Sequence, residues 1–485
     1  MKRILWVLTS FLLLSSCFFY VSCGKEKKQI SSYQIELDII DEHNINGKEK
    51  VTFYNNTENS FTELKFNLFA NAFREDAKYP AIATEYEYSA YPNGKDYGNI
   101  HILSAKCDGE NLTFEVVGED KNVLSVSLLE EIFPEESVEI ELEFKIRLAS
   151  VIARTGNNGK TLNLANVYPI LCGIQDGGFY ECVYYSMGDP YFSDVADYKI
   201  DLSCDSKYVV ASSGELINSE VVNEKTKYQY KIESARSFAL VLSKDFECMT
   251  AKHKNVSVNY YFYDDKSPEI SMEYALKSLK LYDELFGEYP YKTYSVVQTK
   301  FLQGGMEFPA LVMISDALEK KEYGEVIVHE TAHQWWQTVV GNNEIEYGFL
   351  DEGLTEYSVV LFYENHPEYG MNRDSMIKSA EQTYKAYCTV YDKLFGKTDT
   401  KMMRSLKDFT SEYEYVNLAY VKSAIMYDTL RKTVGEEIFF NALKKYYSDY
   451  RFLNVKPSDL VGCFESLGVE VNGYFESFFN GEAII

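Results

Sequence analysis

The sequence predicts an α+β chain of several domains, in which an all-β region with a sandwich or saddle-like sheet precedes a mainly helical region. Its 485 residues are enough for two or three domains that each bury a core. Apolar and polar residues alternate in the first half of the chain, and apolar residues recur at helical spacing in the second half. This change of pattern predicts that the β-region comes first in the chain and the helical region second.

The alternation is clearest in two runs, Tyr33–Ile39 and Val138–Ile146, where every second residue is apolar. A period of two is typical of a strand with one buried face. Because many short strands are separated by turn residues, the pattern favours a sandwich or a saddle. We assign residues 33–250 to this N-terminal β-domain. Shorter strand-like runs are Val51–Tyr54, Tyr208–Ala211 and Tyr228–Ile232.

Helical spacing begins after the β-domain. A helix is predicted from Pro268 to Phe286, with Ser267 as its cap and Gly287 as its end. The rest of the chain is expected to be mostly helical, and we assign residues 251–485 to this second domain. A predicted strand pair interrupts the helices at Tyr294–Val297 and Leu311–Ile314.

The first residues are typical of a signal peptide. Lys2 and Arg3 precede an apolar stretch that runs from Ile4 to about Val21, and the chain then becomes polar. We therefore expect the body of the protein to lie outside the cytoplasm. An uncleaved membrane anchor is the alternative interpretation of the same stretch.

Two cysteines near this stretch resemble the acylated cysteine of a bacterial lipoprotein. Cys23 leads into a polar tether, residues 24–32, whereas three aromatic residues follow Cys17. A lipid-bearing cysteine should precede a solvated linker, so we favour Cys23 and assign residues 1–23 to the signal peptide. The predicted location is the outer side of the bacterial cell membrane, with a lipid anchor.

The composition is strongly acidic. A formal net charge of −26 argues against nucleic-acid binding, because a phosphate backbone would be repelled. The charge is compatible with a cationic substrate such as the free amine of a peptide, and solubility is the alternative explanation. Beyond Cys17 and Cys23, the cysteines show no CxxC spacing, so we predict neither a particular disulfide nor a cysteine zinc site.

A zinc-binding pattern lies in the helical region, where residues 328–333 read Val-His-Glu-Thr-Ala-His. On a helix, His329 and His333 share a face and direct two imidazoles at one point, as zinc requires. Glu330 lies about 100° further round the helix, where it can activate a water at the metal without binding the metal. Apolar neighbours predict a buried helix, which we expect to end near Gly341.

A catalytic zinc site has three protein ligands and one open position, so a third ligand is required. Eighteen residues separate His333 from Glu352, and the helix-like run Leu354–Tyr363 follows. A carboxylate at the start of that helix can face the first helix, which makes Glu352 the candidate. Glu356, one turn further, either bonds a ligand histidine or lies on a solvated face. The alternative for the histidines is a hydrogen-bonded pair in a core without metal.

Three motifs resemble those of the membrane alanyl aminopeptidase family of zinc metallopeptidases, within the gluzincins. The first is the zinc pattern with its spacing. The second is Gly304–Pro309 (Gly-Gly-Met-Glu-Phe-Pro), which resembles the exopeptidase motif Gly-Ala-Met-Glu-Asn of that family. The third is Tyr420–Ala424 (Tyr-Val-Lys-Ser-Ala), which resembles the stretch with the catalytic tyrosine. The order of the two domains matches as well.

The resemblance implies a thermolysin-like catalytic domain that holds one zinc ion per chain through His329, His333 and Glu352. Zinc would lower the pKa of a bound water to about 7. Glu330 would take its proton and deliver it to the leaving amine. Tyr420 would stabilise the oxyanion of the tetrahedral intermediate together with the zinc.

The resemblance also implies residues that bind the substrate. Glu307 would bind the protonated N-terminus of a peptide, because a carboxylate pairs with an ammonium and sets where the chain begins. Gln175 is aligned with a substrate-contacting glutamine of the family. The remaining substrate-binding residues of the motif are Gly304, Gly305 and Met306.

Two departures from the family matter for function. Phe308 stands where the family has Asn, which could loosen substrate positioning or alter the first subsite. The chain ends about 130 residues after Glu352, so we expect it to lack the large helical C-terminal domain of many members and to have a more open active site.

The function expected from these features is removal of N-terminal residues from peptides with a free N-terminus. One alternative is an endopeptidase on the same scaffold, and another is a surface lipoprotein that binds peptides without hydrolysing them. The oligomeric state stays open at this stage.

Overall fold

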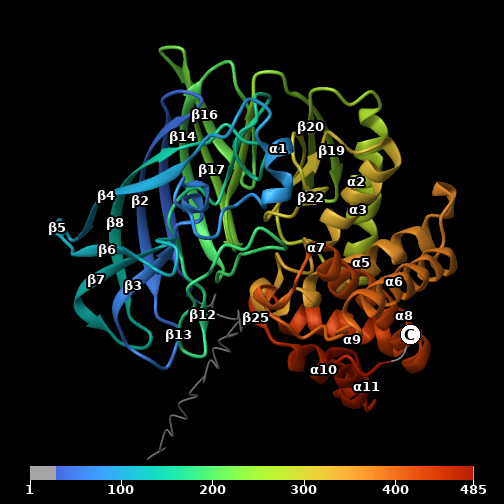
Figure 1. Ribbon diagram of the computed structural model, residues 1–485. Coiled ribbons are helices and arrows are strands. Elements are labelled where there is room, and N and C mark those ends of the chain that lie inside the picture. The colour runs from blue at the N-terminus through green and yellow to red at the C-terminus, as the bar shows by residue number, and fades with distance from the viewer. Residues whose placement is uncertain (1–28, 484) are drawn as a thin grey trace, which may run out of the picture.

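The computed structural model describes residues 29–483 and 485, so the predicted signal segment with Cys17 and Cys23 lies outside the described residues. A β-rich part, blue to green in Figure 1, lies beside a second part with a yellow sheet and orange and red helices. This order confirms the predicted α+β fold class. Within the described residues, no helix has both the length and the apolar character needed to cross a bilayer.

The largest sheet of the β-domain has eight strands, with one buried face and one exposed face. In β1 and β8 buried and exposed side chains alternate, as the sequence predicts. β1 pairs in parallel with β14 and antiparallel with β2, so the first strand lies inside the sheet. The strands in spatial order are β16 (Glu215–Val222), β17 (Lys225–Ala235), β14 (Ala196–Asp205), β1 (Ser32–Ile39), β2 (Asn44–Tyr54), β8 (Ser137–Arg147), β4 (Asn99–Cys107) and β5 (Glu110–Asn111).

Smaller sheets complete the β-domain, and their buried side chains join those of the large sheet in one core. One sheet contains β15 (Val209–Ser212), β18 (Ala239–Ser243), β10 (Leu162–Ala165) and β9 (Thr155–Asn157). Another contains β11 (Ile170–Leu171), β3 (Phe61–Asn67), β7 (Val123–Ile132) and β6 (Phe114–Val117). A hairpin consists of β12 (Ile174–Gln175) and β13 (Gly178–Phe179), and a short helix, α1, spans Glu87–Ala90.

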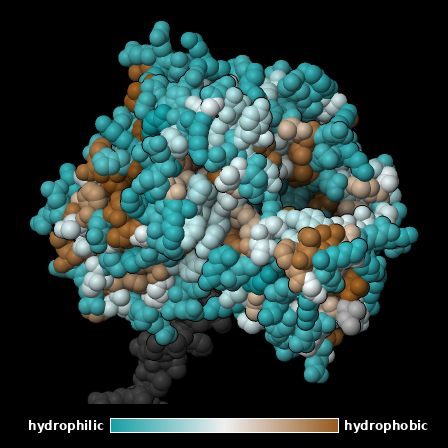
Figure 2. Space-filling model, in the orientation of Figure 1, coloured by the Kyte–Doolittle hydropathy of each residue, from teal (hydrophilic) through white to brown (hydrophobic). Residues whose placement is uncertain are grey.

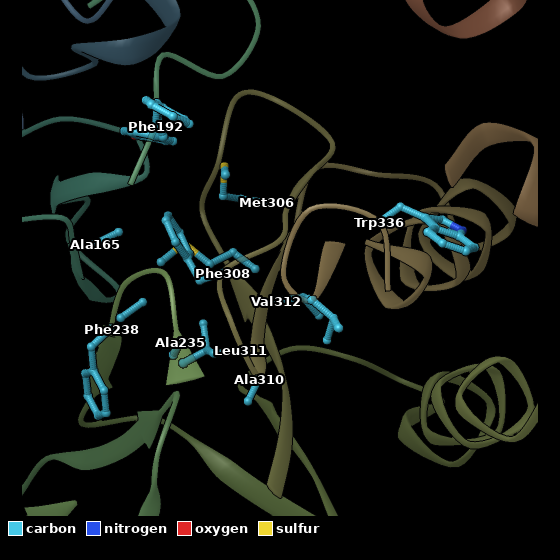
Figure 3. Close-up of a cluster of buried hydrophobic side chains, with 14 of the residues drawn as sticks. Ala165, Phe192, Ala235, Phe238, Met306, Phe308, Ala310, Leu311, Val312 and Trp336 are labelled. Carbon is cyan, nitrogen blue, oxygen red and sulfur yellow. The ribbon is translucent and has the colours of Figure 1, made fainter. Parts of the chain in front are cut away.

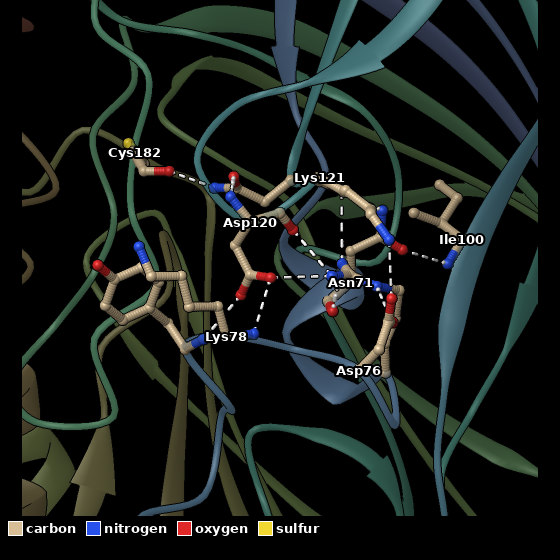
Figure 4. Close-up of polar contacts among 10 residues, drawn as sticks. Asn71, Asp76, Lys78, Ile100, Asp120, Lys121 and Cys182 are labelled. Atoms are coloured by element: carbon tan, nitrogen blue, oxygen red, sulfur yellow. Dashed lines mark hydrogen bonds and ion pairs between the residues drawn. The ribbon is translucent and has the colours of Figure 1, made fainter.

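A cluster of polar contacts fixes the segment after β3 to the rest of the β-domain (Figure 4). The buried Asp120 carboxylate accepts hydrogen bonds from the backbone N–H of Lys78 and from the Arg74 guanidinium, each at 2.9 Å. The Asn71 side chain accepts a hydrogen bond from the Ile100 N–H at 3.1 Å, which joins the segment to β4. The buried acceptors thus receive donors, and these polar contacts fix the segment together with its buried Phe69 and Phe73.

The second part begins with a five-stranded sheet. The predicted strand pair corresponds to β21 and β23, which are parallel to each other. The predicted domain boundary at residue 250 lies inside β19, which pairs with β20 in this sheet. The strands in spatial order are β19 (Glu247–His253), β20 (Val256–Phe262), β21 (Thr293–Thr299), β23 (Leu311–Ser315) and β22 (Gly305–Met306).

Helices form the remainder of the second part, as expected. The first of them begins at Pro268, directly after Ser267, and ends at Leu285, one residue before the predicted end. The helices are α2 (Pro268–Leu285), α3 (Lys320–Ala332), α4 (Glu344–Tyr347), α5 (Phe349–Asn365), α6 (Arg373–Phe395), α7 (Glu412–Tyr415), α8 (Lys422–Val434), α9 (Glu436–Asp449), α10 (Pro457–Glu465) and α11 (Asn472–Phe479). A small parallel sheet joins β24 (Val340–Asn342) to β25 (Leu453–Val455).

Arg236 connects the β-domain to the helical part. Its guanidinium donates hydrogen bonds to the carbonyl oxygens of Gln337, at 2.7 Å, and Leu453, at 2.8 Å. Gly341 in β24 makes room for this contact, because a Cβ at that position would lie 2.0 Å from the guanidinium carbon. The two parts are therefore fixed to each other beside the helix that carries the predicted zinc ligands.

Candidate metal centre and active site

The α3 helix carries the first two predicted ligands. His329 lies in its last turn, and His333 caps its C-terminal end. The prediction that this helix continues to Gly341 is wrong, because the chain turns after His333 and the Thr338 N–H donates to the His333 carbonyl at 3.0 Å. The two imidazoles lie on one side of the chain because the histidines are four residues apart at the end of α3.

The α5 helix supplies the third predicted ligand. Glu352 lies in its first turn and is 3% exposed. Its Oε2 atom lies 3.1 Å from Nε2 of His333 and 3.4 Å from Nε2 of His329, and the two Nε2 atoms lie 3.1 Å apart. Ligands about 2.1 Å from a tetrahedral zinc ion lie about 3.4 Å from one another, so the three atoms have the separation of a metal-binding set.

Neighbouring groups hold the imidazoles in the orientation that metal binding requires. Nδ1 of His333 lies 3.0 Å from the Trp336 carbonyl oxygen and 3.1 Å from the Thr355 hydroxyl. Nδ1 of His329 lies 3.3 Å from the Glu356 carboxylate, so of the two interpretations of Glu356 the structure favours the contact with a ligand histidine. A proton on each Nδ1 leaves the Nε2 lone pairs free to bind a cation.

Electrostatics at this site favour a cation. Burial lowers the pKa of His329, but its contacts with Glu352 and Glu356 raise that pKa to about 10. Burial raises the pKa of Glu352, but the nearby imidazoles lower it to about 2. The Oε2 atom of Glu352 is buried and receives no hydrogen bond. The carboxylates of Glu352 and Glu356 therefore surround the imidazoles with negative charge, which would stabilise a cation between the three donors.

Glu330 lies beside this point on the same helix. Its side chain is buried, its Oε2 atom has no hydrogen-bond partner, and burial raises its pKa to about 7. The β22 edge strand passes directly against it, since a Cβ on Gly305 would lie 2.2 Å from Oε1 of Glu330. A larger residue at position 305 would therefore collide with the Glu330 carboxylate.

Tyr420 reaches the metal site from the segment between α7 and α8. It lies in a π-helical turn, Val416–Val421, between α7 and α8. Its ring stacks on His329, with centroids 5.9 Å apart, and its hydroxyl donates a short hydrogen bond to Oε1 of Glu352. π-Helical turns are frequent at functional sites. The sequence-predicted Tyr420 therefore lies with the metal ligands and Glu330.

These residues line one cavity of about 570 Å³. Figure 2 shows a mostly hydrophilic face that is hollowed near the boundary between the β-domain and the helical part. Of the predicted substrate-binding residues, Gly304, Gly305 and Glu307 line the cavity. A second hollow, about 650 Å³, crosses a face of the eight-stranded sheet and contains none of the predicted site residues.

Glu307 closes the end of the cavity on the His333 side. It is 4% exposed, burial raises its pKa well above the usual value, and its Oε1 atom has no hydrogen-bond partner. Donor atoms of Glu307, Glu330 and His333 lie within 4.8 Å of one another. Asp189 lies beside Glu307, but the Arg154 guanidinium pairs with it at 2.7 Å. Among the described residues, Glu307 and the neighbouring Glu344 are therefore the buried carboxylates at this end that have no ion-pair partner, and of these two Glu307 lines the cavity.

Met306, Phe308 and Gln175, which were also singled out from the sequence, do not line this cavity. Met306 and Phe308 are buried away from the cavity, and Phe308 points towards Ala165 and Phe192 of the β-domain (Figure 3). Phe308 thus fills the core between the two parts and does not contact the space where a substrate would lie. Gln175, in β12, accepts a hydrogen bond from Asn343 at 2.8 Å and does not line the cavity. Its role as a substrate contact stays a prediction.

Sequence reasoning missed Asp189, Arg154 and Glu344. The first two line the cavity, and the buried Glu344 carboxylate lies within 4.8 Å of those of Asp189 and Glu307. The run Gly188–Pro190 (Gly-Asp-Pro), downstream of Gln175, carried the only local signal for Asp189. Arg154 and Glu344 lie in segments without a motif, so only the fold brings them to the site.

Comparison with known proteins agrees with this geometry. Residues 270–479 match the model of the peptidase family M1 domain. The matched region contains His329, His333, Glu352, Glu330 and Tyr420, so this part of the chain is similar to the domain of that family. Aminopeptidase M1-D of Oryza sativa subsp. japonica is 24% identical over 297 residues, which cover 57% of this chain and 33% of that protein.

Other relatives extend the likeness towards the N-terminus. Probable aminopeptidase 1 of Sulfurisphaera tokodaii is 23% identical over 410 residues, which cover 76% of this chain and 49% of that protein. The chain thus spans between a third and a half of the length of these relatives. The crystal structure of an M1 zinc metallopeptidase from Deinococcus radiodurans has a TM-score of 0.66 and 16% identity, and the match covers 94% of this chain and 95% of that one. That likeness establishes the shared fold.

Zinc is the cofactor that this family implies, and the residues of the chain fit it. Two imidazole nitrogens and one carboxylate oxygen converge on one point, which is a ligand set that catalytic zinc prefers. His329, His333 and Glu352 would hold the ion.

Proposed function

We propose that this chain is a zinc-dependent aminopeptidase that removes residues from the free N-terminus of peptides. The observation that carries the proposal is the buried Oε1 atom of Glu307, which has no hydrogen-bond partner and lies beside the catalytic groups. A peptide ammonium would supply the missing donor. A peptide without a free amine would leave that oxygen unpaired, at a cost of about 1–3 kcal/mol or more for a charged group.

The chemistry follows from the groups around the metal site. Zinc, when bound, supplies a Lewis acid that polarises the scissile carbonyl and makes water a stronger acid. Glu330 accepts a proton from the attacking water and delivers it to the leaving nitrogen. The Tyr420 hydroxyl stabilises the charge that develops on the carbonyl oxygen. Because Gly305 lies against Glu330, the base is held in place before the substrate arrives.

The position at which the peptide ammonium binds determines how many residues are removed. With its ammonium at Glu307, a peptide places its first carbonyl near His333 and Glu330, because the donor atoms of these residues lie within 4.8 Å of one another. One residue fits between the ammonium and the scissile bond. A crystal structure of a variant of the Deinococcus radiodurans M1 enzyme bound to a Tyr-Ser-Ala substrate supports a short peptide as the type of ligand.

The proposal is tested with matched peptides that carry a free or an acetylated N-terminus, with zinc and with a chelator. We expect zinc-dependent release of single residues from the free peptides only. The Glu307→Gln variant should lose most kcat/KM on free peptides, about 10²-fold, while its zinc content stays unchanged.

Two results would contradict the proposal. Cleavage of acetylated peptides at the same rate would indicate an endopeptidase and remove the role of Glu307. Binding of free peptides without any hydrolysis, in protein loaded with zinc, would indicate the peptide-binding function instead.

We further propose that the chain is exported and anchored by a lipid on Cys23. The basis is the sequence alone: a charged start, an apolar stretch and a cysteine that precedes a polar tether. Labelling with a fatty-acid probe should mark the wild-type protein and the Cys17→Ala variant but leave the Cys23→Ala variant unmarked. Labelling that depends on Cys17 would overturn the choice of cysteine.

A further inference from the structure

The two helices that carry the metal ligands run antiparallel past each other. His333 lies opposite Glu352, at 3.1 Å, and His329 lies opposite Glu356, at 3.3 Å. The floor of the cavity therefore continues from His333 through His329 towards the start of α3 and the middle of α5. The two ends of this floor can be assigned to the two sides of a scissile bond.

The end near His333 is the amine end, because Glu307 lies there. A peptide that places its ammonium at Glu307 and its first carbonyl at the metal must continue towards His329. The leaving part of the peptide thus passes over the first turns of α3. This direction follows from the positions of Glu307 and the two imidazoles, whichever residue comes first in the peptide.

Carboxylates line the end that receives the leaving part. Glu325 and Glu322 lie one and two turns before His329 on α3, and Glu356 lies opposite on α5. Glu325 is half-buried and has neither a hydrogen bond nor an ion pair among the described residues. Burial and the nearby Glu356 raise its pKa, and this effect exceeds the opposite effect of Lys321 and His329.

Cations are scarce along the same cavity. Arg154 is the only Lys or Arg among the described residues that line it, and its guanidinium is paired with Asp189 at 2.7 Å. Lys321 lies near Glu325 on the same helix but does not line the cavity. The leaving side therefore presents Glu322 and Glu325 with no Lys or Arg partner among the described residues that line the cavity.

A second observation indicates that this cavity takes a ligand with donors. The buried Oε1 atom of Glu307 and the buried Oε2 atom of Glu330 both lack a hydrogen-bond partner, and both residues line the cavity. The acidic end is continuous with these two groups. One extended ligand can thus satisfy the amine position, the catalytic base and the acidic wall together.

We propose that the leaving side of the cleft selects peptides with Lys or Arg directly after the scissile bond, through Glu325 and Glu322. The inference rests on the proposed function, because it requires the peptide to be cleaved after its first residue. A cationic side chain in the second position would gain an ion pair in a partly buried groove, whereas an acidic one would be repelled.

The test compares three peptides that differ only in the second residue: Ala-Lys-Ala-Ala, Ala-Ala-Ala-Ala and Ala-Glu-Ala-Ala. For the zinc-loaded protein we expect kcat/KM for the Lys peptide to exceed that for the Ala peptide about fivefold to tenfold, and the Glu peptide to be the poorest. Raising the salt concentration should reduce the ratio, since the groove is open to solvent.

Variants assign the preference to residues. Glu325→Gln should lower the Lys-to-Ala ratio about threefold, and the double variant with Glu322→Gln should bring it close to one. Gln at position 322 can still accept the hydrogen bond from the Glu319 N–H, so the start of α3 is preserved. Glu437→Gln, an exposed residue of α9 that does not line the cavity, is the matched control and should leave the ratio unchanged.

A ratio near one in the wild type, a preference for the Glu peptide, or a full preference in the double variant would overturn this inference. If no peptide is hydrolysed, the proposed aminopeptidase function is wrong, but this result does not decide the inference about the acidic side. Calorimetric binding of the uncleaved Lys and Glu peptides to the zinc-loaded protein then decides the inference separately: tighter binding of the Lys peptide supports the acidic wall, and equal affinities overturn it.

Discussion

The two parts of the molecule both bury carboxylates, but they surround them differently. In the β-domain, Glu49 lies in the inward row of β2, is 2% exposed, and has no partner for either oxygen. Its charged or polar neighbours are the tyrosines at 33, 168 and 198. In the catalytic region, Glu330 and Glu352 face two imidazoles.

Comparing Glu49 with Glu352 shows that burial of a carboxylate does not by itself indicate a functional role. Burial raises the pKa of Glu49 well above its usual value and nothing nearby reverses it. Burial acts on Glu352 in the same direction, but the imidazoles lower its pKa to about 2. A buried carboxylate with a raised pKa is therefore a poor guide to a site by itself, and the groups opposite it decide its role.

The largest effect is expected at the catalytic base. Glu330→Gln should lower kcat about 10³-fold, because Gln cannot accept the proton of the attacking water. Zinc content, measured by metal analysis, should stay at one ion per chain, since Glu330 is not a ligand. Retention of more than a tenth of the wild-type kcat would show that proton transfer does not depend on this residue.

Zinc removal should distinguish the two parts directly. At zinc concentrations about 1,000 times the Kd, binding stabilises the folded state by about 4 kcal/mol. We expect hydrogen exchange in α3 and α5 to accelerate on chelation, while β2 around Glu49 keeps its protection. Equal acceleration in both parts would mean that they unfold as one unit, and restored protection after adding zinc back is the control.

A smaller effect is expected where β22 touches the catalytic base. Gly305→Ala places a Cβ 2.2 Å from Oε1 of Glu330, so the carboxylate must move and kcat should fall about 10–100-fold. Gly304→Ala is the matched control, because its Cβ would meet Val326 at an ordinary 3.4 Å. Equal losses in both variants would indicate a general effect on the strand.

The smallest effect concerns stability. Glu49→Met should raise the free energy of unfolding at pH 7 by about 1–3 kcal/mol, because it removes an unpaired buried carboxyl. The folded-state pKa of Glu49 is raised, so the wild type is most stable below the unfolded pKa and loses stability as pH rises from there to the folded pKa.

The variant should lack this part of the pH dependence, which amounts to about 1.4 kcal/mol per pH unit within that window. Denaturant unfolding at several pH values measures it, and the exposed Glu36→Met substitution is the control. A destabilised Glu49→Met protein would mean that the carboxyl has a partner in solution.

Local patterns predicted the features that depend on local geometry. The spacing of His329 and His333 requires only one helical turn, and the cap at Ser267 requires only its neighbours. The strands with clear alternation are confirmed for the same reason. Even the contact of Glu356 with His329 follows from the phase of α5 relative to Glu352.

The remaining features depend on contacts between distant segments. The end of α3 was misplaced because Trp335 and Trp336 continue an apolar pattern, although both are buried in a turn. Asp189 and Arg154 come from loops of the β-domain, where no periodicity marks them. The direction of Phe308, into the core between the two parts, required the position of the β-domain itself.

The π-helical turn that carries Tyr420 makes the geometry of the active site depend on the number of residues in this turn. Such a turn holds one residue more than an α-helical turn, so the residues before it are offset by about 100° from the phase of α8. Deleting one residue from the turn would give a more regular helix and rotate the preceding segment, including the cavity-lining Tyr415, away from the metal site. The tyrosines of this wall are therefore placed by an insertion, and homologous chains are best aligned here by helix phase before residue identity.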